Sequence, residues 1–524
     1  MTRRYIISKA AYKTDYEVGQ DNVEILGMDI HNPVFFLSAL LILLFVITTI
    51  MFPTVSKEVL DGAKWWAINH FDWLFMSAGN FFVLFCLALI FLPVGKIRLG
   101  GNDAKPEFSR ISWFSMLFAA GMGIGLMFWS VAEPVAYYTA WYKTPLGVEA
   151  NTAEAASLAM GATMYHWGVH PWAIYGVVAL SLAFFAYNKK LPLTIRSAFY
   201  PLLKERIWGW PGHLIDLLAV LATIFGLATS LGLGAKQAAS GLNYVFETGN
   251  DINVQIGIII FITAVAIFSV VRGIDGGVKL LSNLNMLIAF ILLVFIILVG
   301  TSTGFLSVLF NTFTSYMENI IPLSNFVNRE DEAWLHGWTV FYWAWWISWS
   351  PFVGMFIARI SKGRTVQEFM IAILIIPTLI TMVWMSAFGG TAIEQVQNHI
   401  GELSNGISTV SLAMFQMFDN LAWSSIISVL GIVLVLVFFV TSSDSGSLVI
   451  DSITAGGKMD APVPQRVFWA TMEGLIAGAL LFVGGKDALS ALQAGAITTG
   501  LPFAVVLLFM SWSLYKGLKS EVKS

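Results

Sequence analysis

Apolar segments of about 20 residues recur along most of the chain, separated by short polar segments. A helix of about 20 apolar residues crosses the roughly 30 Å hydrocarbon core of a bilayer, so this pattern predicts an all-α membrane protein. We predict twelve spans, at residues 33–53, 73–93, 111–133, 160–187, 212–240, 252–271, 280–300, 336–358, 369–389, 423–443, 466–484 and 490–514. Segments 304–325 and 408–420 are apolar but interrupted by polar residues, which fits interfacial helices better than spans.

The composition agrees with this pattern. Of the 524 residues, 57% are hydrophobic and only 12% are charged, whereas a soluble domain carries about 25% charged residues. The single cysteine, Cys86, excludes an intramolecular disulfide. The first 31 residues are polar and hold no short apolar region with a cleavage site, so we expect no signal peptide.

Lysine and arginine are distributed unequally between alternate loops. With the N-terminus placed in the cytoplasm, the cytoplasmic segments hold 23 of the 29 lysines and arginines, and the outer loops hold five. Cytoplasmic loops of membrane proteins carry the excess of both residues. We therefore expect a multi-pass protein of the cell (inner) membrane with both termini in the cytoplasm.

Two predicted spans contain residues that interrupt a helix. In the third span, Gly121, Gly123 and Gly125 alternate with larger residues, and each glycine weakens a helix by roughly 1 kcal/mol relative to alanine. In the eighth span, Pro351 removes a backbone donor. Secondary transporters often bind their substrate between two interrupted helices in matching places of two repeats. Close helix packing is the alternative explanation for the glycines.

The third and eighth spans lie five spans apart, and a second copy of a five-span unit must be inverted in the membrane. This spacing predicts two N-terminal spans followed by two inverted repeats. The parts are then a cytoplasmic tail at 1–32, two extra spans at 33–110, a first five-helix repeat at 111–303, an amphipathic connecting helix and loop at 304–335, a second repeat at 336–515 and a short tail at 516–524.

Aromatic residues gather within two spans rather than at their ends. The candidates in the fourth and eighth spans are Trp167, Trp172, Tyr175, Trp345, Trp346 and Trp349. Several of them are three or four residues apart and so share a helix face. Aromatic faces attract a desolvated cation by about 2 kcal/mol or more. The pattern therefore indicates a cage for a quaternary ammonium, with ordinary aromatic packing between helices as the alternative.

Acidic residues are rare within the spans. Glu133 precedes Pro134 at an expected helix end, Asp216 lies near the start of the fifth span, and Asp444 lies at the end of the tenth. A permanent cation is costly to bury without an anion. A zwitterion brings its own carboxylate, which could lie on exposed backbone N–H groups of the glycine segment. We therefore expect a small zwitterionic substrate.

Hydroxyl residues, including Thr441 and Ser442, follow Phe438 at the expected end of the tenth span. Hydroxyl and carbonyl oxygens are ligands for a hard cation, and an unwound backbone around Ala119 and Met122 would supply further oxygens. The alternative is that these hydroxyls only donate to carbonyls of their own helix.

At these residues the chain resembles the betaine/carnitine/choline transporter family. The resemblance covers about residues 30–515 and is carried by segments 121–129, 166–175, 343–352 and 358–365. It implies a LeuT-like inverted-repeat fold preceded by two extra helices, alternating access, and often a homotrimer. In sodium-coupled betaine members, a tryptophan box matches Trp167, Trp172, Tyr175 and Trp346, with Trp345 and Trp349 close by.

The resemblance also implies a substrate and a coupling ion. Gly125 matches a glycine of betaine carriers that is aspartate in choline carriers, so glycine betaine is expected first. Proton-coupled choline uptake and sodium-independent carnitine or betaine exchange are the alternatives. One sodium site of the family matches the backbone of Ala119, Met122 and Phe438 and the hydroxyls of Thr441 and Ser442.

A second sodium site of the family uses two threonines one turn apart and the backbone at the position of Phe352. Thr223 matches the first threonine, but Leu227 stands at the second. A two-sodium stoichiometry is therefore in doubt.

Other function classes fit less well. The spans hold no histidine cluster or paired carboxylates of the kind a membrane enzyme would use, and interrupted helices in two inverted halves suit alternating access better than a channel. We expect the lipid bilayer and a small solute as partners, and no nucleic acid. The short tail after the last span differs from the long basic tail of family members that sense osmotic stress. The choice among glycine betaine, dimethylsulfoniopropionate, ectoine and carnitine stays open, because one methyl group discriminates by only about 1–3 kcal/mol.

Overall fold

The computed structural model describes residues 12–121, 123–272, 278–460 and 462–522 and is almost entirely helical. This confirms the prediction of an all-α protein. A short hairpin precedes the helices. Its strands β1 (Asn22–Ile25) and β2 (Met28–His31) pair antiparallel, and the two turn residues, Leu26 and Gly27, have φ of 51° and 76°, as a two-residue hairpin turn requires.

Ten helices form the first part of the described chain. They are α1 (Asn32–Met51), α2 (Pro53–Phe91), α3 (Arg110–Gly121), α4 (Ile124–Tyr138), α5 (Ala153–Trp167), α6 (Val169–Ala183), α7 (Tyr200–Leu203), α8 (Trp210–Phe246), α9 (Ile252–Arg272) and α10 (Val278–Val299). Eight more follow. They are α11 (Phe305–Ser324), α12 (Glu332–Trp334), α13 (Val340–Ile360), α14 (Val366–Gln397), α15 (Ala413–Asp419), α16 (Ser424–Thr454), α17 (Val463–Gly484) and α18 (Ala488–Val522).

Nine helical segments among the described residues are long and apolar enough to cross a membrane. Residues 463–522, where two spans were expected, count once in that number, because α17 and α18 are joined by a single helical turn. The expected third and eighth spans are not among these nine segments. The third is divided between α3 and α4, and α13 is rich in tryptophan and serine, which lower its mean hydropathy. The count of twelve spans stays a prediction.

The prediction of a loop between the first two spans is wrong. Helix α2 begins at Pro53 and continues without interruption to Phe91, so residues 54–72 are helical. The segment carries charged and aromatic residues, and we had therefore assigned it to a loop. Proline at the first position of a helix costs nothing, because its missing N–H would have no partner there.

The break expected in the third span is confirmed. Helix α3 ends at Gly121 and α4 begins at Ile124, and between them Gly123 has an extended backbone, with φ of −165°. A further break lies at Gly168 in the fourth span, where α5 ends at Trp167 and α6 begins at Val169. There the Tyr316 hydroxyl accepts a hydrogen bond from the freed N–H of Val169, at 3.0 Å.

The prediction of a break at Pro351 is wrong, because α13 continues through this proline to Ile360. Proline lacks the N–H that would bond to the carbonyl four residues earlier, at Ile347. The Ser350 hydroxyl donates to that carbonyl instead, at 2.7 Å. Serine side chains commonly satisfy freed backbone groups in this way in membrane helices, and the sequence pattern did not reveal it.

The tenth span also extends beyond its expected end. Helix α16 continues to Thr454, so Thr441, Ser442 and Asp444 lie inside it rather than at its end. Their backbone carbonyls are consequently within regular helix. Any cation that contacts this segment must use side-chain oxygens or the carbonyls of a neighbouring interrupted helix.

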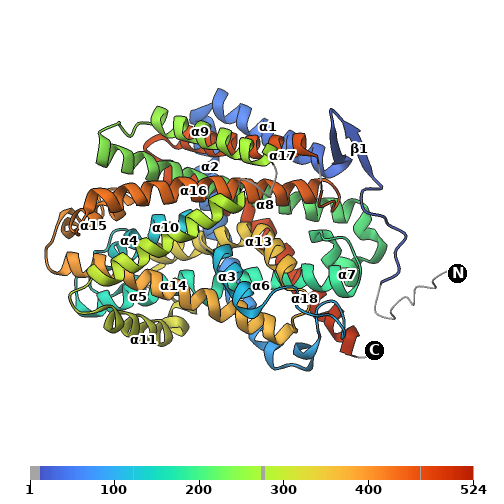
Figure 1. Ribbon diagram of the computed structural model, residues 1–524, viewed down its shortest axis with the longest axis horizontal. Helices are drawn as coiled ribbons and strands as arrows, with labels where there is room; N and C mark the ends of the chain where they lie inside the picture. Colours follow the sequence, from blue (N-terminus) through green and yellow to red (C-terminus); the bar gives the residue numbers. More distant parts are fainter. Residues whose placement is uncertain (1–11, 122, 273–277, 461, 523–524) are drawn as a thin grey trace.

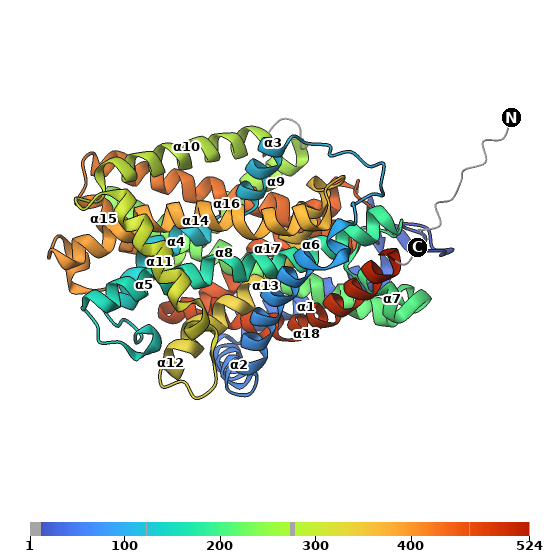
Figure 2. The same ribbon diagram turned by 90° about the horizontal axis from the view of Figure 1, so that it is seen from below.

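Helix α13 lies at the centre of the bundle, where it packs against α2, α6, α8 and α18. Figure 1 shows α8, α14, α16 and α17 extending along the long axis of the molecule. The amphipathic helix expected at 304–325 is present as α11, which crosses obliquely over the bundle and packs against α5 and α14 (Figure 2). The hairpin and the end of α18 lie at the same end of the molecule (Figure 1).

A buried ion pair fixes the segment between α6 and α8 at that end. Asp216 is fully buried in α8 and accepts hydrogen bonds from the backbone N–H of Arg196, at 2.9 Å, and from its guanidinium. Arg196 is only 2% exposed. Two buried charges with good geometry compensate each other, whereas one alone would be costly.

We expect Asp216→Ala to lower the free energy of unfolding by about 3–5 kcal/mol, because Arg196 would remain buried without its anion. The measurement is the thermal midpoint of the purified protein in detergent. Asp487→Asn is the matched control, because Asp487 pairs with Lys57 at 2.6 Å while both side chains are well exposed. An equal loss of stability in the two variants would contradict the assignment.

Candidate functional site

The predicted aromatic residues converge on one small cavity at the centre of the bundle. It is lined by Trp167 from α5, Trp172 and Tyr175 from α6, and Trp345, Trp346 and Trp349 from α13. The other lining residues are Gly123, Gly125, Leu126, Pro171 and Thr381. We call this set the aromatic cage. Gly121 ends α3, and its contact with the cage stays a prediction.

The rings of the cage pack directly on one another. Trp345 and Trp346 are stacked with centroids 4.7 Å apart, and Trp167 meets Trp346 edge-on at 4.9 Å. Tyr175 also meets Trp346 edge-on, at 6.3 Å. The volume of this cavity is about 30 Å³, which is enough for about one water molecule. In this conformation a larger solute fits only if the rings move.

The bare backbone of α4 allows the rings to approach this closely. A Cβ atom built at Gly125 would lie 2.7 Å from Trp345 and 2.9 Å from Trp167. At Gly123 the nearest atom is 3.8 Å away, which is ordinary van der Waals contact. Gly123 precedes the first turn of α4, where no side chain caps the backbone N–H groups. A helix N-terminus with free N–H groups attracts an anion.

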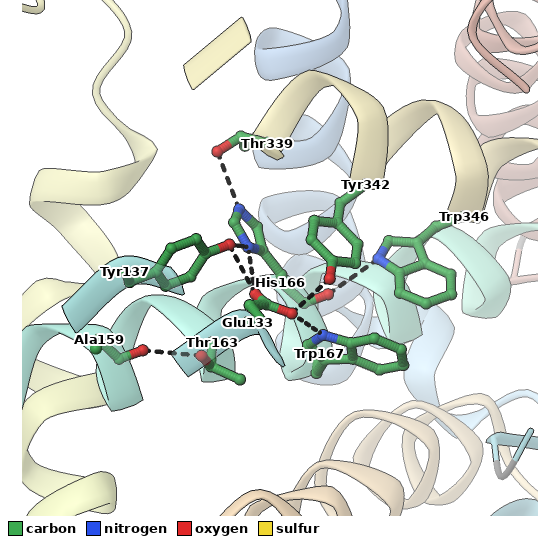
Figure 3. Close-up of polar contacts among 9 residues, drawn as sticks. All are labelled: Glu133, Tyr137, Ala159, Thr163, His166, Trp167, Thr339, Tyr342 and Trp346. Carbon is green, nitrogen blue, oxygen red and sulfur yellow. Dashed lines mark hydrogen bonds and ion pairs between the residues drawn. The ribbon is translucent and has the colours of Figure 1, made fainter. Parts of the chain in front are cut away.

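A buried polar network adjoins the cage (Figure 3). Glu133 on α4 is fully buried, and its carboxylate accepts hydrogen bonds from Trp167 Nε1, at 2.7 Å, and from the Tyr342 hydroxyl. Its second oxygen contacts the Tyr137 hydroxyl at 2.8 Å and His166 Nδ1 at 2.9 Å. The network therefore joins α4, α5 and α13.

The sequence analysis missed the position of Glu133. We had placed it at a helix end because Pro134 follows, but α4 continues to Tyr138 with Pro134 inside it. The available signal was its charge, because an ionisable residue within a membrane span is a functional candidate by default. Thr381 on α14 and Pro171 were also missed, and no pattern in the sequence points to them.

A second cavity, of about 630 Å³, lies outside the cage. Its lining comes from segments that we predicted to face the outside, including residues 61–68, 141–142, 408–411 and 486–493. Phe341 lines this outer cavity and stacks on Trp345 of the cage, with centroids 5.4 Å apart. A layer of aromatic rings thus separates the outer cavity from the cage.

A third cavity, of about 160 Å³, adjoins the cage and is called the inner cavity below. Trp349 lines both spaces. The predicted cation ligands Phe438, Thr441 and Ser442 line this inner cavity, and so does Phe352, which we had assigned to the second ion site. The Thr441 hydroxyl donates to the carbonyls of Val437 and Phe438, at 3.0 and 3.2 Å.

Back-bonding of this kind does not remove a hydroxyl from coordination chemistry, because the oxygen keeps lone pairs when its hydrogen is donated. Ala119 lies near the end of α3, and Met122 lies outside the described residues. At the second expected site, the Thr223 hydroxyl donates to the Ala219 carbonyl at 2.7 Å. Leu227 is fully buried and supplies no oxygen there.

Comparison with known proteins gives a consistent result. The family described as BCCT, betaine/carnitine/choline family transporter, matches residues 33–523. The chain is 66% identical over 510 residues to glycine betaine transporter 1 of Vibrio parahaemolyticus serotype O3:K6 (strain RIMD 2210633), which covers 97% of both chains. It is 62% identical over 513 residues to a glycine betaine/proline/choline/ectoine transporter of the same strain, covering 98% of this chain and 91% of the relative.

A third relative, from Bacillus subtilis, is similar over most of the chain. The chain is 41% identical over 472 residues to the glycine betaine transporter OpuD of Bacillus subtilis (strain 168), which covers 90% of this chain and 91% of the relative.

The close packing of rings against α4 makes a testable prediction. We expect Gly125→Ala to destabilise the protein by about 1–3 kcal/mol, because the new methyl group must displace two indole rings. The tryptophan fluorescence spectrum should shift with it. Thermal unfolding and fluorescence of the purified protein measure both effects.

Gly123→Ala is the matched control. It adds the same methyl group two residues earlier, where the nearest side-chain atom is 3.8 Å away and no ring has to move. If the two variants lose the same stability, the cost comes from helix geometry and not from the rings.

Proposed function

The chain belongs to the betaine/carnitine/choline family of transporters, and on this premise we propose that it imports a small quaternary-ammonium zwitterion, glycine betaine first, by sodium symport. It is a transporter and not an enzyme. The observation that carries the proposal is the aromatic cage, whose indole and phenol rings meet at the uncapped start of α4.

The chemistry of the cage suits both ends of such a solute. A quaternary ammonium donates no hydrogen bond, and electron-rich ring faces attract it by about 2 kcal/mol or more when it is desolvated. The carboxylate would bind backbone N–H groups at the first turn of α4, next to Gly123 and Gly125. The described lining of the cage holds no charged side chain that would compete for either end.

The three cavities support alternating access. The outer cavity, the cage and the inner cavity adjoin one another through single aromatic side chains, Phe341 with Trp345 on one side and Trp349 on the other. Rotation of these rings together with their helices would open the cage to one side at a time. We include in the proposal twelve spans in a LeuT-like inverted repeat, cytoplasmic termini, an inner-membrane location and a homotrimer.

Sodium is the second substrate in this proposal. Thr441 and Ser442 on α16 face the inner cavity, and carbonyls at the end of α3, near Ala119, would complete the coordination. An ion held between two helices of opposite repeats stabilises one arrangement of those helices over another, which is how ion binding couples to solute binding.

The range of solutes is a second question. One relative at 62% identity is named for glycine betaine, proline, choline and ectoine together. Proline and ectoine lack the trimethylammonium group, so a shared site must accept several cationic head groups. Uptake of a labelled panel of these solutes into proteoliposomes, with and without a sodium gradient, tests both the range and the coupling.

We expect Trp346→Ala to weaken the apparent affinity for glycine betaine about thirtyfold, because one aromatic face contributes about 2 kcal/mol. Saturable uptake into proteoliposomes measures it. Trp343→Ala is the matched control, since Trp343 is equally buried on α13 but does not line the cage. An unchanged affinity in Trp346→Ala would remove the cage from the proposal.

Replacing both Thr441 and Ser442 with alanine should raise the sodium concentration for half-maximal uptake at least tenfold, by loss of two oxygen ligands. Uptake is measured against sodium at constant membrane potential. Thr223→Ala should leave this concentration unchanged and the Hill coefficient near one, because Leu227 occupies the position of the second threonine. Full uptake in sodium-free buffer would contradict sodium coupling, and a Hill coefficient near two would show a second site.

A further inference from the structure

Glu133 holds a charge that the cage itself lacks. We propose that the Glu133 carboxylate is a fixed negative charge that selects solutes with a cationic head group, acting on the cage through Trp167. This inference rests on the proposed function, because it assigns the electrostatic partner of the same solute. It makes Glu133 a residue that determines specificity without touching the substrate.

Trp167 connects Glu133 to the cage directly. Its Nε1 donates to Glu133 at 2.7 Å, and the opposite edge of the same indole lies 2.9 Å from the position of a Cβ at Gly125. The charge is therefore one indole ring away from the cavity. Glu133 and Gly125 are eight residues apart on α4, about 12 Å along the helix, and helical side chains lean back toward the N-terminus.

Four polar groups surround the Glu133 carboxylate. Trp167 Nε1 is a donor only, and it shares one carboxylate oxygen with the Tyr342 hydroxyl. Tyr137 and His166 Nδ1 contact the other oxygen. A carboxylate can accept all four contacts when the His166 imidazole carries its hydrogen on Nδ1.

His166 does not neutralise this charge. Its Nε2 lies 3.0 Å from the Thr339 hydroxyl, which can donate to it, so a neutral imidazole with its hydrogen on Nδ1 satisfies both contacts. The ring is fully buried, and burying a neutral imidazole costs less than burying an imidazolium. The pair then keeps a net charge of minus one.

A charge in this place acts on a cation in two ways. Directly, at an effective dielectric constant of about 20, the attraction of a carboxylate for an ammonium about 8 Å away exceeds its repulsion of a second carboxylate about 12 Å away by enough to change the affinity for a zwitterion roughly threefold. Indirectly, an indole that donates to a carboxylate is polarised, which makes its ring a better partner for a cation. Both effects depend on the positive charge of the solute and not on its shape.

The orientation of the solute follows. The start of α4 attracts its carboxylate, and Glu133, more than two turns further along the same helix, attracts its ammonium group. The two ends of α4 thus favour one orientation of a zwitterion. They disfavour an anion of the same shape, which would be repelled by Glu133.

The test compares glycine betaine with 3,3-dimethylbutanoate, in which carbon replaces the ammonium nitrogen and the shape is retained. Binding of labelled glycine betaine to the purified full-length protein in nanodiscs gives its affinity, and competition gives that of the acid. In Glu133→Gln we expect the affinity for glycine betaine to fall about threefold and that of the acid to improve, so that the ratio of the two affinities changes roughly thirtyfold.

Glutamine at position 133 can preserve the network. Its oxygen accepts from Trp167 and Tyr342, and its amide group donates to the Tyr137 hydroxyl and to His166 Nδ1 once the imidazole hydrogen moves to Nε2. Tyr342→Phe is the matched control, because it removes one hydrogen bond from the same carboxylate and keeps the charge. The ratio of the two affinities should stay at the wild-type value in that variant.

A loss of affinity for both compounds by the same factor in Glu133→Gln would overturn the proposal, because only structure would then be affected. An unchanged affinity for glycine betaine would also overturn it. If the glutamine variant does not fold, Glu133→Asp must retain the wild-type ratio, and a ratio near one overturns the proposal. Absence of glycine betaine binding in the wild-type protein would instead reject the proposed function.

Discussion

In a lipid bilayer, a helix can be interrupted only where other protein groups satisfy the backbone groups that the interruption frees. The structure depends on this constraint at the two breaks that form the cage. At Gly168 the Tyr316 hydroxyl accepts from the Val169 N–H. At the start of α4, Gly123 supplies no side-chain cap, and Gly123 and Gly125 line the cage. One break is thus satisfied by a side chain of another helix, and the other adjoins the cavity.

The same region holds a buried carboxylate that is fully surrounded by donors. Glu133 joins α4, α5 and α13 through Trp167, His166 and Tyr342. Removing one partner from a buried network of this kind leaves an unsatisfied group, so the network helps to hold the Trp167 ring in its place in the cage.

The tightly packed cage also bears on transport. Its rings stack with almost no free volume, while larger spaces lie outside and inside it. Packed cores change between discrete arrangements rather than deforming continuously, and a few aromatic rings between two cavities provide such a discrete barrier. Small movements of α13, which carries Trp345, Trp346 and Trp349, would affect both boundaries at once.

The sequence by itself determined the membrane class, the helical fold and the aromatic residues of the cage. Apolar length depends on the bilayer thickness, and aromatic residues three or four positions apart must share a helix face, so neither depends on tertiary contacts. The break at Gly123 could be predicted because glycine is costly in any helix.

Tertiary structure alone decided where the helices continue and which groups surround Glu133, because both depend on hydrogen-bond partners that are not set by the sequence pattern. Pro351 does not break α13, since the Ser350 hydroxyl replaces the missing donor. Thr441 and Ser442 lie inside a helix that continues to Thr454. Glu133, which the sequence shows only as an acid before a proline, lies beside Trp167 because α5 and α13 pack against α4 there. A buried charge is tolerated only where other groups pair with it, and here several of those groups come from other helices. The order of residues along α4 cannot predict which residues of other helices these are.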